Sequence, residues 1–185
     1  NMWSWSARRT LSVAQELYDT HKVATYPRTD SRYLPEDMME EISKTIRKLG
    51  AQDNLAPHSK RLVDNGLSNA KRNFDNSKVS DHFAIIPTGK IPPENMSADA
   101  KKLYDLVARQ FLASFHPESV WKVEKRIATK QNQNFVKEGR SLTTPGWRAV
   151  RPKKQDLPAG WGALSANPSA ATLDSHEFKE EKTKP

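Results

Sequence analysis

The segment Thr25-Tyr26-Pro27-Arg28-Thr29-Asp30-Ser31-Arg32-Tyr33-Leu34-Pro35 separates two patterns that are typical of helices. Pro27 disfavours a helical conformation at the residue before it, so Tyr26 is expected to lie on a loop. A second segment follows later in the chain, Ser80-Asp81-His82-Phe83-Ala84-Ile85-Ile86-Pro87-Thr88. The candidate catalytic residues lie on these two segments.

Two helices are expected to flank the Tyr26 segment. Ser6 suits the N-cap of a helix over 7–20, where apolar residues recur at helical spacing. A second helix is expected over 35–49, because this stretch begins with a proline and meets Gly50 at its end. Its acidic residues come early and its basic residues late, which suits the helix dipole.

Further helices are expected in the middle of the chain. The polar stretch 51–79 predicts only a short helix over 59–65. Ser97 is a suitable cap for an amphipathic helix over 98–115. The apolar face of that helix consists of Leu103, Leu106, Val107, Phe111 and Leu112.

After this helix the sequence pattern changes period. Loose alternation predicts strands over 120–129, 134–136 and 146–150, with a hairpin turn at 130–133 and a short strand near Thr172.

The expected fold class is therefore α+β. A helical domain over residues 1–117 would carry the tyrosine, and a β-rich segment over residues 118–185 would form part of an antiparallel sheet begun elsewhere.

The composition indicates a polyanionic partner. The chain has 30 Lys and Arg against 22 Asp and Glu, a formal charge of +8, which favours nucleic acid first and a membrane surface second. The alternative is that the excess charge only keeps the protein in solution. The absence of cysteine excludes disulfides and Cys-ligated zinc. The first residues lack the pattern of a signal peptide and no apolar stretch is long enough to span a membrane, so a cytoplasmic protein is expected.

Tyr26 is a candidate nucleophile for phosphoryl transfer. A phenol oxygen that attacks a phosphodiester forms a covalent link that conserves the bond energy, so a strand can be resealed without ATP. Because tyrosine ordinarily has a pKa of about 10, it needs a nearby cation or base. Arg28 could hold the scissile phosphate, and Asp30 could orient Arg28. Thr29 and Ser31 offer hydroxyls to adjacent phosphates. Alone, this tripeptide pattern also suits a half-buried loop tyrosine beside a solvated arginine.

The two segments together resemble the type IA DNA topoisomerases, of the topoisomerase III subclass. The Tyr26 segment is similar to the signature of that family across all its positions, and His82-x-Ala84-Ile85-x-Pro87-Thr88 is similar to its histidine motif. The helix before Tyr26 and the stretch from Phe135 to Trp147 also resemble the family. The resemblance thus covers nearly all of residues 7–150.

The resemblance implies roles for individual residues. Tyr26 would form a 5′-phosphotyrosine link, Arg28 would hold the scissile phosphate, and His82 would hydrogen-bond near the phosphate backbone with its charge influenced by Asp81. The residues implied to contact DNA are Gln15, Thr29, Ser31, Arg32 and Asp81. The implied fold is winged-helix-like, and the implied partners are single-stranded DNA and the remaining topoisomerase domains, at the bacterial nucleoid.

Magnesium is implied for the whole enzyme but not for this stretch of sequence. Type IA enzymes hold the metal in an acidic Toprim domain, whose Asp-x-Asp-x-Glu cluster is not found here. The run Glu36-Asp37-Met38-Met39-Glu40-Glu41 is better explained as the solvated first turn of a helix. Without Toprim, the chain is expected to be inactive in DNA relaxation when isolated.

Other side chains invite a binding interpretation. Trp121 and Trp147 are expected on strands with a core role, although aromatic residues also stack on bases. A basic groove could be formed by Arg8, Arg9, Arg28, Arg32, Lys71 and Arg72, although a solvated face explains most such runs. The alternative function is therefore a non-catalytic module that binds single-stranded nucleic acid. A tyrosine recombinase is set aside, because that class places its tyrosine near the C-terminus.

Overall fold

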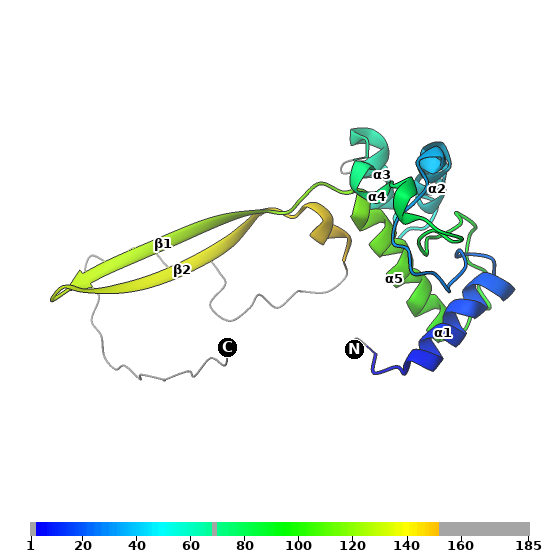
Figure 1. The fold of residues 1–185 in the computed structure, drawn as a ribbon, viewed down its shortest axis with the longest axis horizontal. Coiled ribbons are helices and arrows are strands. Elements are labelled where there is room, and N and C mark those ends of the chain that lie inside the picture. The colour runs from blue at the N-terminus through cyan, green and yellow to red at the C-terminus, as the bar shows by residue number, and fades with distance from the viewer. Residues whose placement is uncertain (1–2, 68–69, 152–185) are drawn as a thin grey trace. The chain divides into compact units, whose positions relative to one another are not determined.

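The computed structural model describes residues 3–67 and 70–151 and contains both helices and strands (Figure 1). The described residues divide into two compact units, one made of residues 3–121 with 142–151 and the other of residues 122–141. The strand expected near Thr172 and the charged tail lie outside the described residues. No helix within the described ranges is both long enough and apolar enough to cross a membrane.

Helix α1, Ala7–Gln15, begins at the expected cap, where the Ser6 hydroxyl accepts a hydrogen bond from the Arg9 amide at 3.2 Å. The expected helix over 7–20 does not keep α geometry to its end, because Glu16–Thr20 form a π-helical turn. This wider turn accompanies the burial of Leu17, whose carbonyl accepts from the Val23 amide at 3.0 Å. Single π turns of this kind are frequent at functional sites.

Helix α2, Met39–Leu49, follows a short 3-10 turn at Glu36–Met38 and ends at Gly50, as predicted. Helix α3, Ala56–Asn65, begins before the predicted residue 59, because Pro57 suits a first helical turn. The buried Ser59 hydroxyl on α3 donates to the Ile46 carbonyl on α2, which joins the two helices. Helix α4 is a single turn, Ala70–Asn73.

Helix α5, Ala98–Phe115, is the longest helix among the described residues. The Ser97 hydroxyl accepts from the Ala100 amide at 3.1 Å, so the predicted cap is confirmed. Leu103, Phe111 and Leu112 are buried, as the apolar pattern predicted. Leu106, which belongs to the same predicted face, is 37% exposed because it lines an open cavity.

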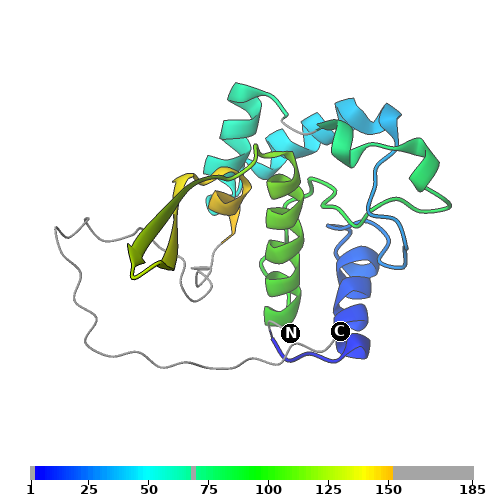
Figure 2. The ribbon, with the colours of Figure 1, turned by 60° about the vertical axis from the view of Figure 1, so that its left-hand side comes forward.

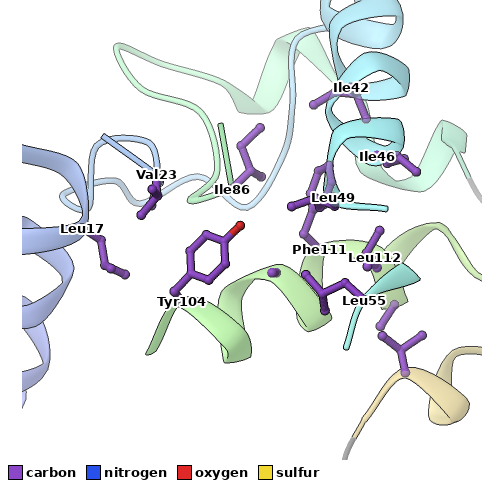
Figure 3. Close-up of a cluster of buried hydrophobic side chains, with 14 of the residues drawn as sticks. Leu17, Val23, Ile42, Ile46, Leu49, Leu55, Ile86, Tyr104, Phe111 and Leu112 are labelled. Carbon is purple, nitrogen blue, oxygen red and sulfur yellow. The ribbon is translucent and has the colours of Figure 1, made fainter. Parts of the chain in front are cut away.

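The hydrophobic core of the helical unit forms around α5. In Figures 1 and 2, α1 and α5 lie side by side, and the two helices are in contact. Figure 3 shows side chains from α2 and α5 that meet in the buried cluster, together with Leu17, Val23 and Ile86 from outside these two helices. Val23 lies just before the Tyr26 segment and Ile86 lies within the His82 segment, so the core holds both segments through these apolar residues.

Strands β1, Val120–Lys130, and β2, Gln133–Thr144, form an antiparallel hairpin (Figure 1). Gln131 and Asn132 both have positive φ, 50° and 58°, as a two-residue type I′ turn requires. The first strand and the turn are confirmed. The strand predicted over 134–136 is much longer than expected.

The strand predicted over 146–150 is wrong, because Gly146–Val150 form a 3-10 turn. Pro145 has helical dihedral angles and starts that turn. Gly146 has φ +52°, and a side chain there would overlap the Glu118 and Pro117 backbone, so only glycine fits. The half-buried Trp147 still packs against the core, but from this turn instead of a strand.

Acidification is expected to destabilise the helical unit through two histidines. His116 is 1% exposed and its Nε2 lies 3.2 Å from the His58 carbonyl oxygen. Burial lowers the pKa of both His116 and His58 below the ordinary 6.5. Both histidines therefore bind protons more readily in the unfolded chain than in the folded one. The free energy of unfolding should fall as the pH drops below 6.5. Urea denaturation across this range would measure the fall.

The matched variant is His116→Leu, which fills a similar volume with an apolar side chain and removes one titrating group. Its free energy of unfolding should depend less on pH than that of the wild type. An equal loss on acidification in both proteins would contradict this assignment.

Candidate active site

The Tyr26 segment and the His82 segment pair side by side. Ala24 and Pro87 form an antiparallel bridge. The Thr25 amide donates to the Ile86 carbonyl at 2.9 Å, and the Thr88 amide donates to the Val23 carbonyl at 3.0 Å. The two sequence motifs thus form one short ladder, with Tyr26 directly after it.

The Thr25 side chain adds a second link between the segments. Its half-buried hydroxyl donates to the Ala84 carbonyl at 3.1 Å and accepts from the Ile86 amide at 2.9 Å. One hydroxyl therefore satisfies a donor and an acceptor on the opposite segment, which fixes the register between them. Replacing it with an apolar group would leave both partners without this bond, at a cost of about 1–3 kcal/mol.

The Tyr26 ring contacts two other rings. Its centroid lies 4.6 Å from that of His82, with the rings tilted by 47°. It lies 5.2 Å from that of Tyr18, which meets it edge-on at 73°. Tyr18 belongs to the π-helical turn, so the end of the first helix, the tyrosine loop and the histidine segment meet at Tyr26.

Arg28 is exposed, and no residue in the described ranges pairs with its guanidinium. The sequence interpretation had Asp30 orienting it, but Asp30 instead accepts from the Ser80 hydroxyl at 3.5 Å. The cation is thus available for an anion from outside the described residues.

Thr29 and Ser31 use their hydroxyls to shape the loop. Thr29 donates to the His82 carbonyl at 3.1 Å and accepts from the Ser31 amide at 3.0 Å. Ser31 donates to the Lys78 carbonyl at 2.7 Å and accepts from the Tyr33 amide at 3.1 Å. Since each hydroxyl proton is already donated to a carbonyl, these side chains mainly hold the loop against the histidine segment.

The remaining predicted site residues lie around this centre. The Arg32 guanidinium lies 5.7 Å from the centre of the Tyr33 ring, and Gln15 is half-buried at the end of α1. Asp81 is exposed, and within the described part of the chain it makes no ion pair with His82. The structure thus brings Tyr26 and His82 together, with Thr29 bonded to the His82 carbonyl. Among the described residues, no hydrogen bond or ion pair joins Tyr26 to Gln15 or Asp81.

A cavity of about 540 Å³ beside Tyr26 reveals two cations that the sequence interpretation missed. Lys22 and Lys90 line it together with Tyr18 and Tyr26. The Lys22 ammonium lies 5.2 Å from the Tyr18 ring centre, and its backbone has a positive φ of 56° just after the π turn. The only sequence signal was that each lysine lies close to one of the two motifs.

Two of the basic residues singled out from the sequence form ion pairs. Arg9 pairs with Asp99, and Arg72 pairs with Glu118 at 3.0 Å. The side chain of Lys71 lies outside the described residues.

Tyr33 offers a second phenol close to the site. It is half-buried, and its oxygen lies 3.5 Å from the Lys78 ammonium. That hydrogen bond, with a further contribution from Arg32, lowers the pKa of Tyr33. Tyr33 is therefore the natural control for any test of Tyr26 as nucleophile.

The described residues do not fit a magnesium site. They contain no group of three or more His, Cys, Asp or Glu side chains that could hold a metal ion. In the acidic run near the start of α2, Glu40 pairs with Lys44 at 2.7 Å. Any metal used with Tyr26 would need carboxylates from elsewhere.

Comparison with known proteins identifies the family to which the chain belongs. The family model described as DNA topoisomerase matches residues 1–185. The chain belongs to the type IA DNA topoisomerase family.

Its curated relatives are named DNA topoisomerase 3. The chain is 37% identical to the Bacillus licheniformis protein over 149 residues, which cover 80% of the chain and 20% of that relative. It is 38% identical to the Shouchella clausii protein over 159 residues, 83% of the chain and 21% of the relative. Identity to the Haemophilus influenzae protein is 33% over 153 residues, 82% and 23% of the two chains. The chain therefore spans about a fifth of the length of these relatives.

Lys22 and Lys90 are expected to contribute to DNA affinity by neutralising phosphates beside Tyr26. Lys22→Gln and Lys90→Gln should each weaken binding of a single-stranded oligonucleotide. Each should also reduce the slope of log affinity against log salt by about 1. Fluorescence anisotropy over a salt series measures both quantities.

Lys44→Gln is the control, because Lys44 lies on α2 and pairs with Glu40. A salt slope that falls equally in all three variants would contradict a specific role for the cavity.

Proposed function

We propose that this chain carries the strand-cleaving tyrosine of a type IA topoisomerase, with Tyr26 as the nucleophile. The observation that supports this most is the contact between the Tyr26 and His82 rings, 4.6 Å between centroids. The paired segments hold that contact in place, so the nucleophile and a group suited to the phosphate backbone lie within one small site.

The proposed chemistry is a reversible transfer of a phosphoryl group. The Tyr26 phenol loses its proton and its oxygen bonds to phosphorus, while the bond from phosphorus to the 3′ oxygen breaks. The departing 3′ oxygen takes up a proton and becomes a hydroxyl, and the 5′ end stays linked to Tyr26. Resealing is the reverse reaction, which needs no ATP because the phosphodiester energy is kept in the phosphotyrosine.

Arg28 and His82 would act on the phosphate that is attacked. The exposed Arg28 guanidinium can donate two parallel hydrogen bonds to the phosphate oxygens. Donors aimed at developing charge in such sites contribute about 10²–10³-fold in rate. His82 would hydrogen-bond near the backbone, and the Lys22 and Lys90 ammonium groups would attract neighbouring phosphates.

In the whole enzyme this chain would form the movable half of the cleavage site. We assign residues 1–117 to a winged-helix-like tyrosine domain and residues 118–185 to the return segment of the gate domain. The change from helix to strand between Phe115 and Val120 is the basis of that boundary, while the turn Gly146–Val150 packs back against α5. Lifting the domain away would open a gate in single-stranded DNA, for relaxation or decatenation of cytoplasmic, nucleoid-associated DNA.

The chain alone should be inactive or nearly so. Magnesium would be held by the acidic domain of the whole enzyme, since the described residues here do not fit it. The chain would supply the nucleophile and the phosphate-binding cations.

A second candidate function is a module that binds single strands without chemistry. The cavity with Lys22 and Lys90 favours it, because cations beside aromatic rings bind nucleic acid with or without a cleavage step.

A covalent-trapping assay tests the proposal. An end-labelled single-stranded oligonucleotide with magnesium would be incubated with this chain alone and with a separately produced fragment that carries the acidic metal-binding domain. We expect a 5′-phosphate adduct, located by peptide mass spectrometry on Tyr26, only when both proteins are present. Tyr26→Phe should abolish it.

Tyr33→Phe is the matched control and should leave the adduct intact. An adduct on Tyr33 would contradict the assignment of the nucleophile. If no adduct forms in any mixture while oligonucleotide binding is the same in Tyr26→Phe, the binding module becomes the better account.

A further inference from the structure

A second cavity lies along the C-terminal half of α5, away from the Lys22 cavity. It has a volume of about 570 Å³ and is lined by polar and charged side chains, which include Arg72, Gln110, Trp147 and Arg151. Glu118 is its acidic lining residue, and its carboxylate pairs with Arg72. The described lining is therefore positively charged.

Trp147 gives this cavity an aromatic wall held by arginines. The guanidinium carbons of Arg148 and Arg151 each lie 4.7 Å from the Trp147 ring centre. Arg151 is exposed and also donates to the Gln110 side chain at 2.9 Å. The Trp147 amide donates to the Pro117 carbonyl at 2.9 Å, which anchors the turn that presents the ring.

This cavity adjoins another that begins at the Tyr26 loop. The adjoining cavity, of about 420 Å³, is lined by Thr29, Ser31 and Arg32 at one side and by apolar side chains, among them Ile85, Leu106 and Phe111, elsewhere. The two cavities share Asn73, Gln110 and Ser114 in their linings. The α5 residues that line them run from Leu106 to Ser114, a rise of about 12 Å along the helix.

We propose that these two cavities form one groove, the α5 groove, that binds the single strand beyond the cleavage position. A base would stack on Trp147, and Arg32 and Arg151 would contact phosphates on either side. The α5 groove depends on the proposed function in one respect: the strand that it binds would enter it from the Tyr26 loop.

The arginines and the Trp147 ring favour nucleic acid as the occupant of this groove. Single-strand binding sites combine a cationic path for the backbone with aromatic rings for the bases. The α5 groove has both features, and its guanidinium groups already lie over the ring that a base would cover. A stacked base would take the place of Arg151 on Trp147, which would free that cation for a phosphate.

Oligonucleotide length separates this groove from the Tyr26 site. Anisotropy would measure the affinity of the whole chain for a short oligothymidine that covers only the Tyr26 site and for a longer one that reaches the α5 groove. Trp147→Leu should weaken the longer oligonucleotide roughly tenfold and leave the short one unchanged. Arg151→Gln should weaken the longer one and lower its salt slope by about 1.

Arg151→Gln keeps the test decisive if Trp147→Leu disturbs the core, because Arg151 is exposed. Arg47→Gln on α2 is the matched control and should change neither affinity. Equal affinities of wild type and Arg151→Gln for the longer oligonucleotide, with the fold intact by circular dichroism, would overturn the groove.

The experiments distinguish a failure of the cleavage role of Tyr26 from a failure of the α5 groove. The trapping assay on the short oligonucleotide, with the acidic-domain fragment present, reports on Tyr26 alone. A missing adduct with length-dependent loss in Arg151→Gln would support the groove and contradict the cleavage role. A normal adduct with no effect of Trp147→Leu or Arg151→Gln would contradict the groove alone.

Discussion

The two hydrogen bonds of the Thr25 hydroxyl are the constraint on which the candidate site depends. They join the backbone just before Tyr26 to Ala84 and Ile86, residues far away in the sequence. The bridge between Ala24 and Pro87 continues the same pairing, and the buried Val23 and Ile86 fix its apolar side in the core. The position of the Tyr26 ring against His82 follows from this register.

The same constraint divides the polar side chains into two groups. Thr25, Thr29 and Ser31 donate their hydroxyl protons to backbone carbonyls, so they hold the loop in shape. The side chains left to meet a phosphate are cations, with Arg28 exposed and Lys22 and Lys90 in the adjacent cavity. A rigid polar loop that presents cations and a phenol suits a site in which a nucleophile must meet an anion without rearrangement.

Local sequence signals predicted the elements whose causes are local. Ser6, Ser97 and Gly50 mark helix ends through their own capping bonds or conformations, and the Gln131-Asn132 turn follows from the hairpin pattern. The π turn at Glu16–Thr20 was not predicted; its residue Leu17 is buried in the core, a contact that the local sequence does not specify. The 3-10 turn at Gly146 was also missed. There the backbone of Pro117 and Glu118, distant in the sequence, lies against Gly146. Lys22 and Lys90 were missed because only the fold brings them to Tyr26.

The central claim is that the Thr25 bridge holds Tyr26 against His82, and NMR of the aromatic side chains tests it most directly. Nuclear Overhauser cross-peaks between the Tyr26 and His82 ring protons should be present in the wild type. They should weaken or vanish in Thr25→Val, while the amide signals of α5 stay unchanged. Their absence from the wild type, or undiminished cross-peaks in Thr25→Val, would contradict the account.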